Sequence, residues 1–227
     1  MKLLRLHNVS IFEQLQIEEA LFRVGRGEWC LLNSGSPAAI VMGISGNAEA
    51  LVEPSPLPLI RRFTGGGCVV VDESTLFVTF IGDMPHPTPT KIHSWVEARI
   101  KPLLDPLPFS LRENDYVLGD KKFGGSAQSI AKNRFLHHTS LLWSFNPELM
   151  AFLKMPPKSP SYRRGRSHAE FLTSLSPYFP SKALLFDRLT PSLAPFEIPA
   201  SHEIEALLSL PHRRSLVLCK INFSALG

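Results

Sequence analysis

Residues 61–72, which read RRFTGGGCVVVD, place three successive glycines between two apolar runs. Successive glycines cost chain entropy on folding, so they are expected where the backbone approaches a ligand closely or presents several N–H groups to an anion. Arg61 and Arg62 precede the glycines and can donate paired hydrogen bonds to phosphate or carboxylate. The stretch has neither the spacing of a Walker P-loop nor that of a GxGxxG dinucleotide turn. It fits either an anion site or a tight strand connection with glycine at positive φ.

Apolar runs bounded by turn residues lie on both sides of this stretch and predict strands. We expect strands at residues 3–6, 29–32, 39–43, 59–62, 68–71, 76–81, 116–118, 123–130 and 135–145. Capping residues followed by apolar residues at helical spacing predict further elements. These are helices after Ser10, Thr90 (ending near Pro102), Asn146 and Ser167, and near residues 182–189 and 201–210. Strands joined by short loops, with helices between and after them, favour an α+β fold with a mostly antiparallel sheet flanked by helices.

The composition is that of a soluble globular chain. Of 227 residues, 44% are hydrophobic and 19% are charged, which excludes a disordered protein and allows one large domain. The three cysteines form no CxxC pair and favour a reduced, cytoplasmic protein. Glu13, Glu18 and Glu19 argue against a secretory signal, and the uncharged stretch 29–48 is too polar to span a membrane.

Positive charge is concentrated late in the chain. Lys and Arg number 24 against 20 Asp and Glu, for a net charge of +4. The run from Lys154 to Arg166 (KMPPKSPSYRRGR) contains no acidic residue. It fits a solvated loop or a docking surface for an acidic partner. Nucleic acid is disfavoured because no known binding motif accompanies the run.

Two later segments carry polar groups suited to the same kind of ligand. Asn114 and Asp115 precede residues 121–127 (KKFGGSA), where a lysine among small residues can reach over a ligand and hold a carboxylate and a phosphate together. Taken alone, this segment is more typical of a polar hairpin. His137 and His138 begin HHTSLLW. Adjacent side chains of a strand point to opposite faces, so the two histidines make a poor zinc pair.

Together these segments resemble the lipoate–protein ligase family, part of the biotin/lipoate ligase and transferase superfamily. The family pattern is RRxSGGGxVxHD, then ND, then KxxGSA, then HHGTLL; this sequence has RRFTGGGCVVVD, Asn114-Asp115, KFGGSA from Lys122, and HHTSLL, in the same order. The GISGN stretch at residues 43–47 also matches, and the resemblance covers about residues 1–180. Val71 stands where the family has histidine, and HHGT has become HHTS.

The resemblance implies ATP-dependent ligation of lipoate, or octanoate, to a specific lysine of a lipoyl domain through an acyl-adenylate, with Mg²⁺ as cofactor. Lys122 would be the catalytic residue that bridges the acyl carboxylate and the α-phosphate. Asp115 would be the Mg²⁺ ligand, with Asp72 and Asp120 as competitors. The residues expected to contact substrate or nucleotide are Arg61, Arg62, Thr64, Gly65, Gly66, Gly67, Cys68, Val69, Asn114, Gly125, Ser126, Ala127, His138 and Ser140. The apolar tail would lie in a slot walled by Val69, Val71, Phe77 and Ile81.

Two other functions stay open. One is an octanoyl or lipoyl transferase that works through a thioester on Cys68, since no cysteine lies between Cys68 and Cys219. The other is a non-catalytic module that binds lipoyl domains or an acyl-adenylate, which Val71 and the short C-terminal segment suggest. A biotin ligase is disfavoured because a GRGRxGRxW-type loop is missing from the sequence.

The same resemblance predicts the organisation and partners of the chain. Residues 1–180 would form the catalytic domain, and residues 181–227 a helical C-terminal extension in which the family's accessory domain is absent or vestigial. The acceptors would be the lipoyl domains of 2-oxoacid dehydrogenase complexes or the H protein of glycine cleavage. A separate accessory subunit is a further candidate partner, whereas nucleic acid and membrane are not.

Overall fold

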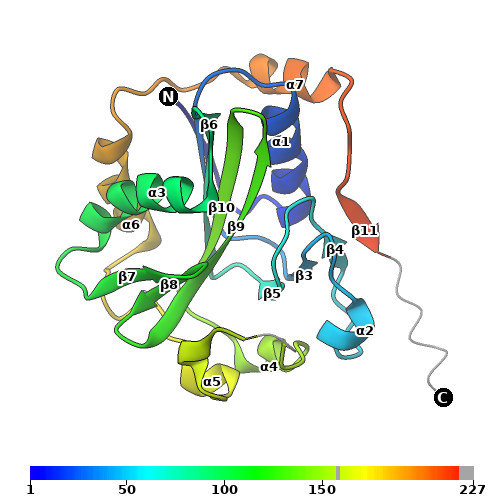
Figure 1. Ribbon diagram of the computed structural model, residues 1–227, viewed down its shortest axis with the longest axis vertical. Helices are drawn as coiled ribbons and strands as arrows, with labels where there is room; N and C mark the ends of the chain where they lie inside the picture. The colour runs from blue at the N-terminus through cyan, green and yellow to red at the C-terminus, as the bar shows by residue number, and fades with distance from the viewer. Residues whose placement is uncertain (157–158, 220–227) are drawn as a thin grey trace.

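The computed structural model describes residues 1–156 and 159–219 and contains two sheets (Figure 1). The larger sheet has seven strands, in the spatial order β1 (Lys2–Leu6), β2 (Trp29–Ser34), β6 (Thr75–Asp83), β10 (Arg134–Leu142), β9 (Lys121–Ala131), β8 (Asp115–Leu118) and β7 (Phe109–Arg112). The smaller sheet has four, in the order β11 (Val217–Cys219), β4 (Leu59–Arg61), β3 (Ala39–Met42) and β5 (Cys68–Val71). Only β1–β2 and β3–β4 are parallel among these pairs. The predicted α+β fold with a mostly antiparallel sheet is confirmed.

Helices cover both faces of the larger sheet. Helix α1 (Ile11–Arg23) lies on one face, and α3 (Pro89–Leu104) and α6 (Lys182–Leu189) lie on the other. The other described helices are α2 (Ala48–Leu51), α4 (Pro147–Met150), α5 (His168–Phe171) and α7 (Ser201–Ser209), with short 3₁₀ turns η1 (Ser161–Arg163) and η2 (Thr190–Leu193). Strand β6 is buried along eight of its nine residues. Its alternate side chains therefore enter two separate cores, because successive residues of a strand face opposite sides.

The two cores are divided by the larger sheet. Leu76, Val78 and Phe80 of β6 pack with α3 and α6 in the first core. Phe77 and Ile81 of the same strand pack with α1 and the smaller sheet in the second. The second core thus lies between the two sheets and places α1 against the strands that follow the triple glycine.

Helix α3 differs from its predicted limits. It begins after Thr88, whose side chain accepts from the Lys91 N–H, with Pro89 in the first turn. A proline is tolerated there because its missing N–H would have no partner within the helix. The helix also continues past Pro102, and Leu103 and Leu104 are buried in the first core. Burial of these two leucines outweighs the loss of one backbone hydrogen bond in the last turn.

The C-terminal part of the chain packs on both cores. Leu185, Leu189 and Leu193 belong to the first core, and Ile204 and Leu207 of α7 pack against the second. The two predicted helices near residues 182–189 and 201–210 are confirmed. Strands β7 and β11 were not predicted; β11 pairs antiparallel with β4.

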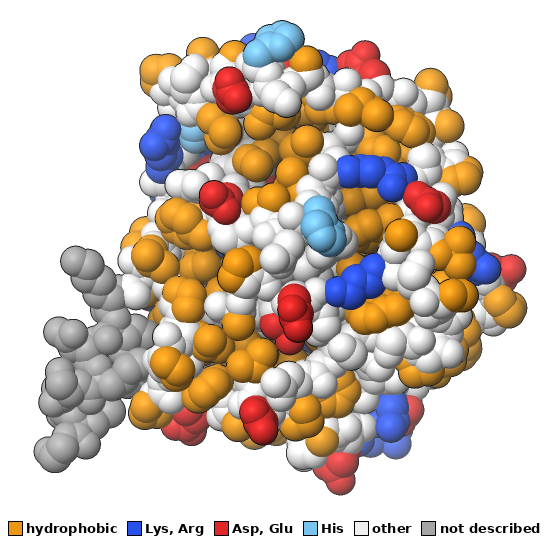
Figure 2. Space-filling model, turned by 180° about the vertical axis from the view of Figure 1, so that it is seen from behind, with side chains coloured by type: hydrophobic (Ala, Val, Ile, Leu, Met, Phe, Trp, Pro, Cys, Tyr) orange, Lys and Arg blue, Asp and Glu red, His pale blue; other side chains and the backbone are white. Residues whose placement is uncertain are grey.

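The surface carries both signs of charge. On the face shown in Figure 2, acidic and basic side chains are interspersed among apolar ones and form no continuous field of one sign. Within the described ranges, the helices are too short or too polar to cross a lipid bilayer.

Candidate active site

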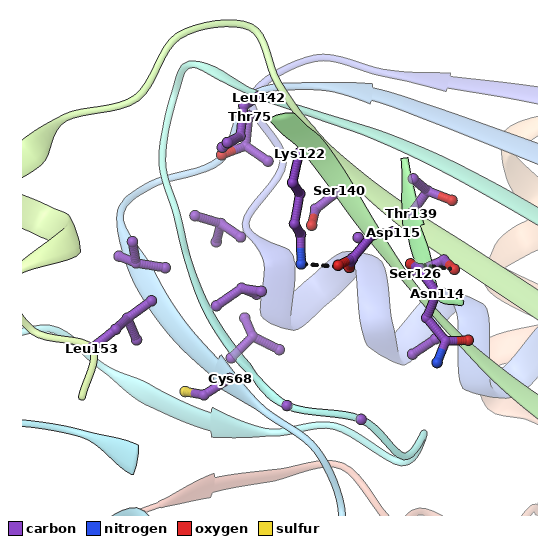
Figure 3. A pocket seen from close by; sticks show the side chains of 18 of the residues that line it. Cys68, Thr75, Asn114, Asp115, Lys122, Ser126, Thr139, Ser140, Leu142 and Leu153 are labelled. Atoms are coloured by element: carbon purple, nitrogen blue, oxygen red, sulfur yellow. Dashed lines mark hydrogen bonds and ion pairs between the residues drawn. The ribbon is translucent and has the colours of Figure 1, made fainter. Parts of the chain in front are cut away.

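A cavity of about 410 Å³ is lined by the triple-glycine segment, by α1 and by strands β5, β6, β8, β9 and β10 (Figure 3). It brings together most of the residues that the sequence singled out. The predicted residues that line it are Arg62, Gly66, Gly67, Cys68, Val69, Asn114, Asp115, Lys122, Gly125, Ser126, Ala127, His138 and Ser140. Arg61, Thr64 and Gly65 are not part of its wall.

The glycine loop, residues 65–67, presents backbone donors. Among the backbone hydrogen bonds of the described residues, none is donated by the N–H groups of these three glycines. Gly66 has φ +95°, and a Cβ there would lie 2.7 Å from the Arg62 Nη2 atom. Unpaired N–H groups at the wall of a cavity form a concave site for an anion. The loop therefore suits a phosphate or carboxylate oxygen.

A second glycine lets another turn of chain approach the loop. A Cβ on Gly43 would lie 2.2 Å from the carbonyl oxygen of Gly66, and the Gly43 N–H donates to the carbonyl of Gly67 at 3.1 Å. Any larger residue at position 43 would push the glycine loop away. The GISGN stretch thus supports the loop through backbone contact.

The two arginines before the loop bind protein carbonyls. Arg61 donates from Nη1 to the carbonyls of Ile44 (3.1 Å) and Gly46 (2.7 Å). Arg62 is buried and donates from Nη2 to the carbonyl of Gly65 at 2.7 Å. Burial lowers the pKa of the Arg62 guanidinium to about 10. Both arginines therefore hold the loops in place: Arg62 donates from Nε, Nη1 and Nη2 to protein acceptors, and Arg61 donates from Nη1 and lies outside the cavity wall.

Lys122 reaches into the cavity from the start of β9 and forms an ion pair (Figure 3). Its Nζ lies 2.7 Å from Asp115 Oδ1 on β8, and a Cβ on Gly125 would lie 3.1 Å from the same nitrogen. The second oxygen of Asp115 accepts from the Tyr162 hydroxyl at 2.7 Å. Burial and this hydrogen bond raise the pKa of Tyr162. Tyr162, on η1, was missed by the sequence analysis.

Asp115 is the predicted magnesium ligand, and both of its oxygens have protein partners. Among the residues that the structure describes, no three His, Cys, Asp or Glu side chains come together as a metal site. Magnesium in proteins is commonly held by one or two carboxylates together with substrate phosphates. The donor set thus fits a magnesium ion only when nucleotide phosphates supply most of its ligands.

The adjacent histidines face opposite sides of β10, as predicted. His137 is fully buried and contacts the Tyr116 hydroxyl at 3.0 Å and the Gln128 amide at 3.1 Å. Burial lowers the pKa of His137 well below its usual value. His138 lies at the cavity wall, where Nε2 is 3.0 Å from Thr64 Oγ1 and Nδ1 is 2.8 Å from Glu18 Oε2. Both nitrogens of His138 are therefore engaged by the protein.

Glu18 is a cavity residue that the sequence analysis did not propose. It is 0% exposed and lies on α1, three residues after Leu15 and four before Phe22. These three positions share one helix face, so an acidic residue interrupts an otherwise apolar stripe. That interruption is the signal by which the sequence could have identified Glu18.

Cys68 lines the cavity, but its surroundings disfavour a nucleophile. Burial raises the pKa of its thiol to about 11. Because the thiolate is the reactive form, only about one in 10⁴ of these thiols would be ionised at pH 7. A thioester mechanism would need a base, and among the described residues no hydrogen bond or ion pair joins Cys68 to one.

An apolar wall occupies another side of the cavity. It includes Val69, Val71 and Phe77, three of the four residues expected there, together with Ile11 and Leu15 of α1. Ile81, the fourth predicted wall residue, lies in the second core and outside the cavity lining. Val71 therefore extends an apolar surface where the family pattern has histidine.

The basic run does not form one exposed patch. Arg163 is buried, and its Nε donates to the carbonyl of Arg166 at 2.9 Å. Arg166 pairs with Asp120 at 3.0 Å. Arg164 is exposed. Arg166 thus fixes the segment to the β8–β9 turn, whereas Arg163 bonds within the segment. Lys158 lies outside the described residues.

The fold is that of a lipoate–protein ligase catalytic domain. A structure of lipoate-protein ligase A bound with ATP is 20% identical, with a TM-score of 0.76 over 91% of this chain and 92% of that one. A bipartite lipoate protein ligase from Thermoplasma acidophilum, described with its E2 lipoyl domain, is also 20% identical, with a TM-score of 0.76 over 91% and 89%. A putative lipoate protein ligase from T. acidophilum with bound lipoic acid is 18% identical, with a TM-score of 0.74 over 91% and 92%.

The chain belongs to the lipoyl protein ligase A/B catalytic domain family, which matches residues 10–193. A curated relative from Plasmodium falciparum, named inactive lipoate–protein ligase 2, is 28% identical over 236 aligned residues. The match covers 73% of this chain and 60% of the relative, so the chain spans well under the relative's full length.

Proposed function

We propose that the protein joins lipoate, or octanoate, to a lysine of a lipoyl domain through an acyl-adenylate made from ATP. One observation carries this proposal: the Lys122 ammonium and the glycine loop line the same cavity. An acyl carboxylate and a triphosphate repel each other, so positive groups and N–H donors must hold them together for reaction. The relatives solved with ATP and with lipoic acid support this choice of ligands.

In the first step, the carboxylate oxygen of the acyl substrate attacks the α-phosphorus of ATP and pyrophosphate leaves. Lys122 Nζ would bridge the carboxylate and the α-phosphate, and the N–H groups of residues 65–67 would donate to phosphate oxygens. Removal of one preorganised donor of this kind lowers the rate by about 10²–10³. Magnesium, brought by the nucleotide phosphates with Asp115 as a protein ligand, would neutralise phosphate charge.

In the second step, the neutral amine of the acceptor lysine attacks the acyl carbonyl, AMP leaves, and the amine gives up a proton. A free lysine has a pKa of about 10.4, so few are neutral at pH 7. The positive charge of Lys122 near the incoming amine would lower the pKa of that amine. The apolar wall with Val69, Val71 and Phe77 would hold the acyl tail away from water.

The acceptors we propose are the lipoyl domains of 2-oxoacid dehydrogenase complexes or the glycine-cleavage H protein, in the cytoplasm. The bipartite archaeal ligase described with its E2 lipoyl domain supports both a lipoyl-domain acceptor and a separate accessory subunit. We further propose residues 1–180 as the catalytic domain and 181–227 as its extension.

The test is incubation with ATP, Mg²⁺, lipoate and a panel of lipoyl domains, followed by intact mass measurement of each domain. We expect one lipoyl adduct on an acceptor and lipoate-dependent exchange of pyrophosphate into ATP. A transferase would instead modify the acceptor from octanoyl-carrier protein without ATP. A stable acyl adduct on Cys68 would then replace the ligase proposal.

A non-catalytic binding module is the second candidate, and the relative named inactive favours it. The apolar Val71 and the Lys122–Asp115 ion pair also suit a site that binds a ligand without turning it over. Absence of pyrophosphate exchange, even with a candidate accessory subunit, together with retained binding of lipoate or ATP, would select this candidate over the ligase.

A further inference from the structure

A chain of hydrogen bonds joins helix α1 to the residue that precedes the glycine loop. The Glu18 carboxylate accepts from Gln14 Nε2 at 2.7 Å and from Thr79 Oγ1 at 2.6 Å, and it contacts His138 Nδ1 at 2.8 Å. His138 Nε2 is 3.0 Å from Thr64 Oγ1. Glu18 and Thr64 are 0% and 1% exposed, so water does not compete for most of this chain.

The chain has a defined direction. A carboxylate only accepts, so the Nδ1 atom of His138 carries the hydrogen that Glu18 receives, and in the neutral imidazole Nε2 is then an acceptor. The Thr64 hydroxyl then donates to that Nε2 atom. Its oxygen in turn accepts from Arg62 Nε at 2.9 Å. With this arrangement, each donated hydrogen between Arg62 and Glu18 has one acceptor.

Arg62 and Thr64, at the other end of this series of hydrogen bonds, determine how the glycine loop is held. Arg62 Nη2 donates to the Gly65 carbonyl at 2.7 Å, and the backbone carbonyl of Thr64 accepts from the Ile44 N–H at 2.9 Å. The peptide on each side of Gly65 is thus anchored on the protein side. The N–H groups of Gly66 and Gly67, which line the cavity, have no protein acceptor among the described backbone bonds.

We propose that Glu18 and His138 are positioning residues that hold Thr64, and through Thr64 and Arg62 the glycine loop, in the conformation that binds the anionic part of the ligand. His138 was expected to contact substrate directly. The ring lines the cavity, and its two nitrogens are committed to Glu18 and Thr64, through which we propose that it acts. The proposal rests on the proposed function in one respect, that the anion is the triphosphate of ATP.

The central test compares two substitutions of Thr64. Thr64→Ser keeps the hydroxyl, whereas Thr64→Val keeps the shape and removes the hydroxyl, leaving His138 Nε2 and Arg62 Nε without this partner. The probe is ATP, measured by isothermal titration calorimetry. We expect Thr64→Val to weaken ATP binding by about tenfold or more, in line with an unsatisfied buried polar group, and Thr64→Ser to bind within about threefold of the wild type. Equal affinity of the two variants would overturn the proposal.

Two matched variants on α1 distinguish the loss of the hydrogen bonds to His138 from a general effect of charge or helix stability. Glu18 and Glu19 are neighbouring buried acids, but Glu19 accepts from the backbone of Ser215 and Leu216 and does not contact the cavity chain. Glu18→Gln is expected to weaken ATP binding severalfold more than Glu19→Gln at similar melting temperatures. The same loss in both variants would show that the effect is structural and would count against the proposal.

A spectroscopic measurement without any ligand tests the direction of the hydrogen bonds through His138. Long-range ¹H–¹⁵N spectra of the wild type are expected to show His138 protonated on Nδ1 and unprotonated on Nε2, with the signals identified by their loss in His138→Gln. A hydrogen on Nε2 would refute the proposed direction. If the wild type fails to bind ATP, the proposed function is wrong. The tautomer of His138, and the amide chemical shifts of Gly65–Gly67 compared between Thr64→Val and Thr64→Ser, still decide whether Thr64 positions the loop.

Discussion

Replacement of Lys122 by alanine separates a catalytic role of this lysine from a structural one. The ion pair to Asp115 measures 2.7 Å, and the two side chains are 25% and 11% exposed. Asp115 keeps the Tyr162 hydroxyl as a donor in the variant. For a partly exposed pair whose acid retains a second partner, we expect a stability loss of about 1 kcal/mol. In a chain of this size that loss lowers Tm by about 2–4 °C.

The chemical effect should be far larger than the effect on stability. If Lys122 bridges the acyl carboxylate and the α-phosphate, its loss should lower lipoate-dependent ATP–pyrophosphate exchange by about 10²–10³. Lys121→Ala is the matched control, because Lys121 is the preceding residue of β9, points to the other face and is exposed. Near-normal exchange in Lys122→Ala, or an equal loss in Lys121→Ala, would refute the assignment.

Three further predictions concern the surroundings of the cavity. Tyr162→Phe removes the second donor to Asp115, so this carboxylate should hold Lys122 more strongly and ATP should bind severalfold more weakly by calorimetry; unchanged or tighter binding would contradict this. Cys68→Ala should retain pyrophosphate exchange within about threefold, because burial raises the pKa of the thiol to about 11 and keeps it protonated; loss of acyl transfer with an intact fold would instead support a thioester route. Gly43→Ala places a Cβ 2.2 Å from a carbonyl oxygen of the glycine loop, so we expect a loss of about 1–3 kcal/mol in the free energy of unfolding, measured by denaturant titration. A stability equal to that of the wild type would show that the loop can move aside.

The sequence predicted the main groups of the candidate site because their signals are local. The triple glycine, the lysine among small residues and the paired histidines each stand out within a few positions, and the resemblance supplied their common purpose. The residues that were missed have distant partners: His138 meets Glu18 at a separation of 120 positions, and Tyr162 meets Asp115 at a separation of 47. No short pattern encodes such pairs.

The basic run shows what local composition leaves open. Its lack of acidic residues fitted either a solvated loop or a docking surface, because a run of cations without acids is normally solvated. Arg163 is buried, and Arg166 is bound to Asp120 from a different part of the chain. Among the described residues of the run, the charges of Arg163 and Arg166 are thus bound by the protein, while Arg164 is exposed.

What the sequence by itself determined is the set of local elements and the presence of groups able to meet an anion, since caps, strand alternation and glycine conformations depend on neighbouring residues. Only the tertiary structure decided which of those groups face the cavity and which are consumed by protein partners. The two sheets and α1 bring His138 within hydrogen-bond distance of both Glu18 and Thr64. The physical reason is that a hydrogen bond between distant residues depends on strand register and helix packing, which the whole core establishes together.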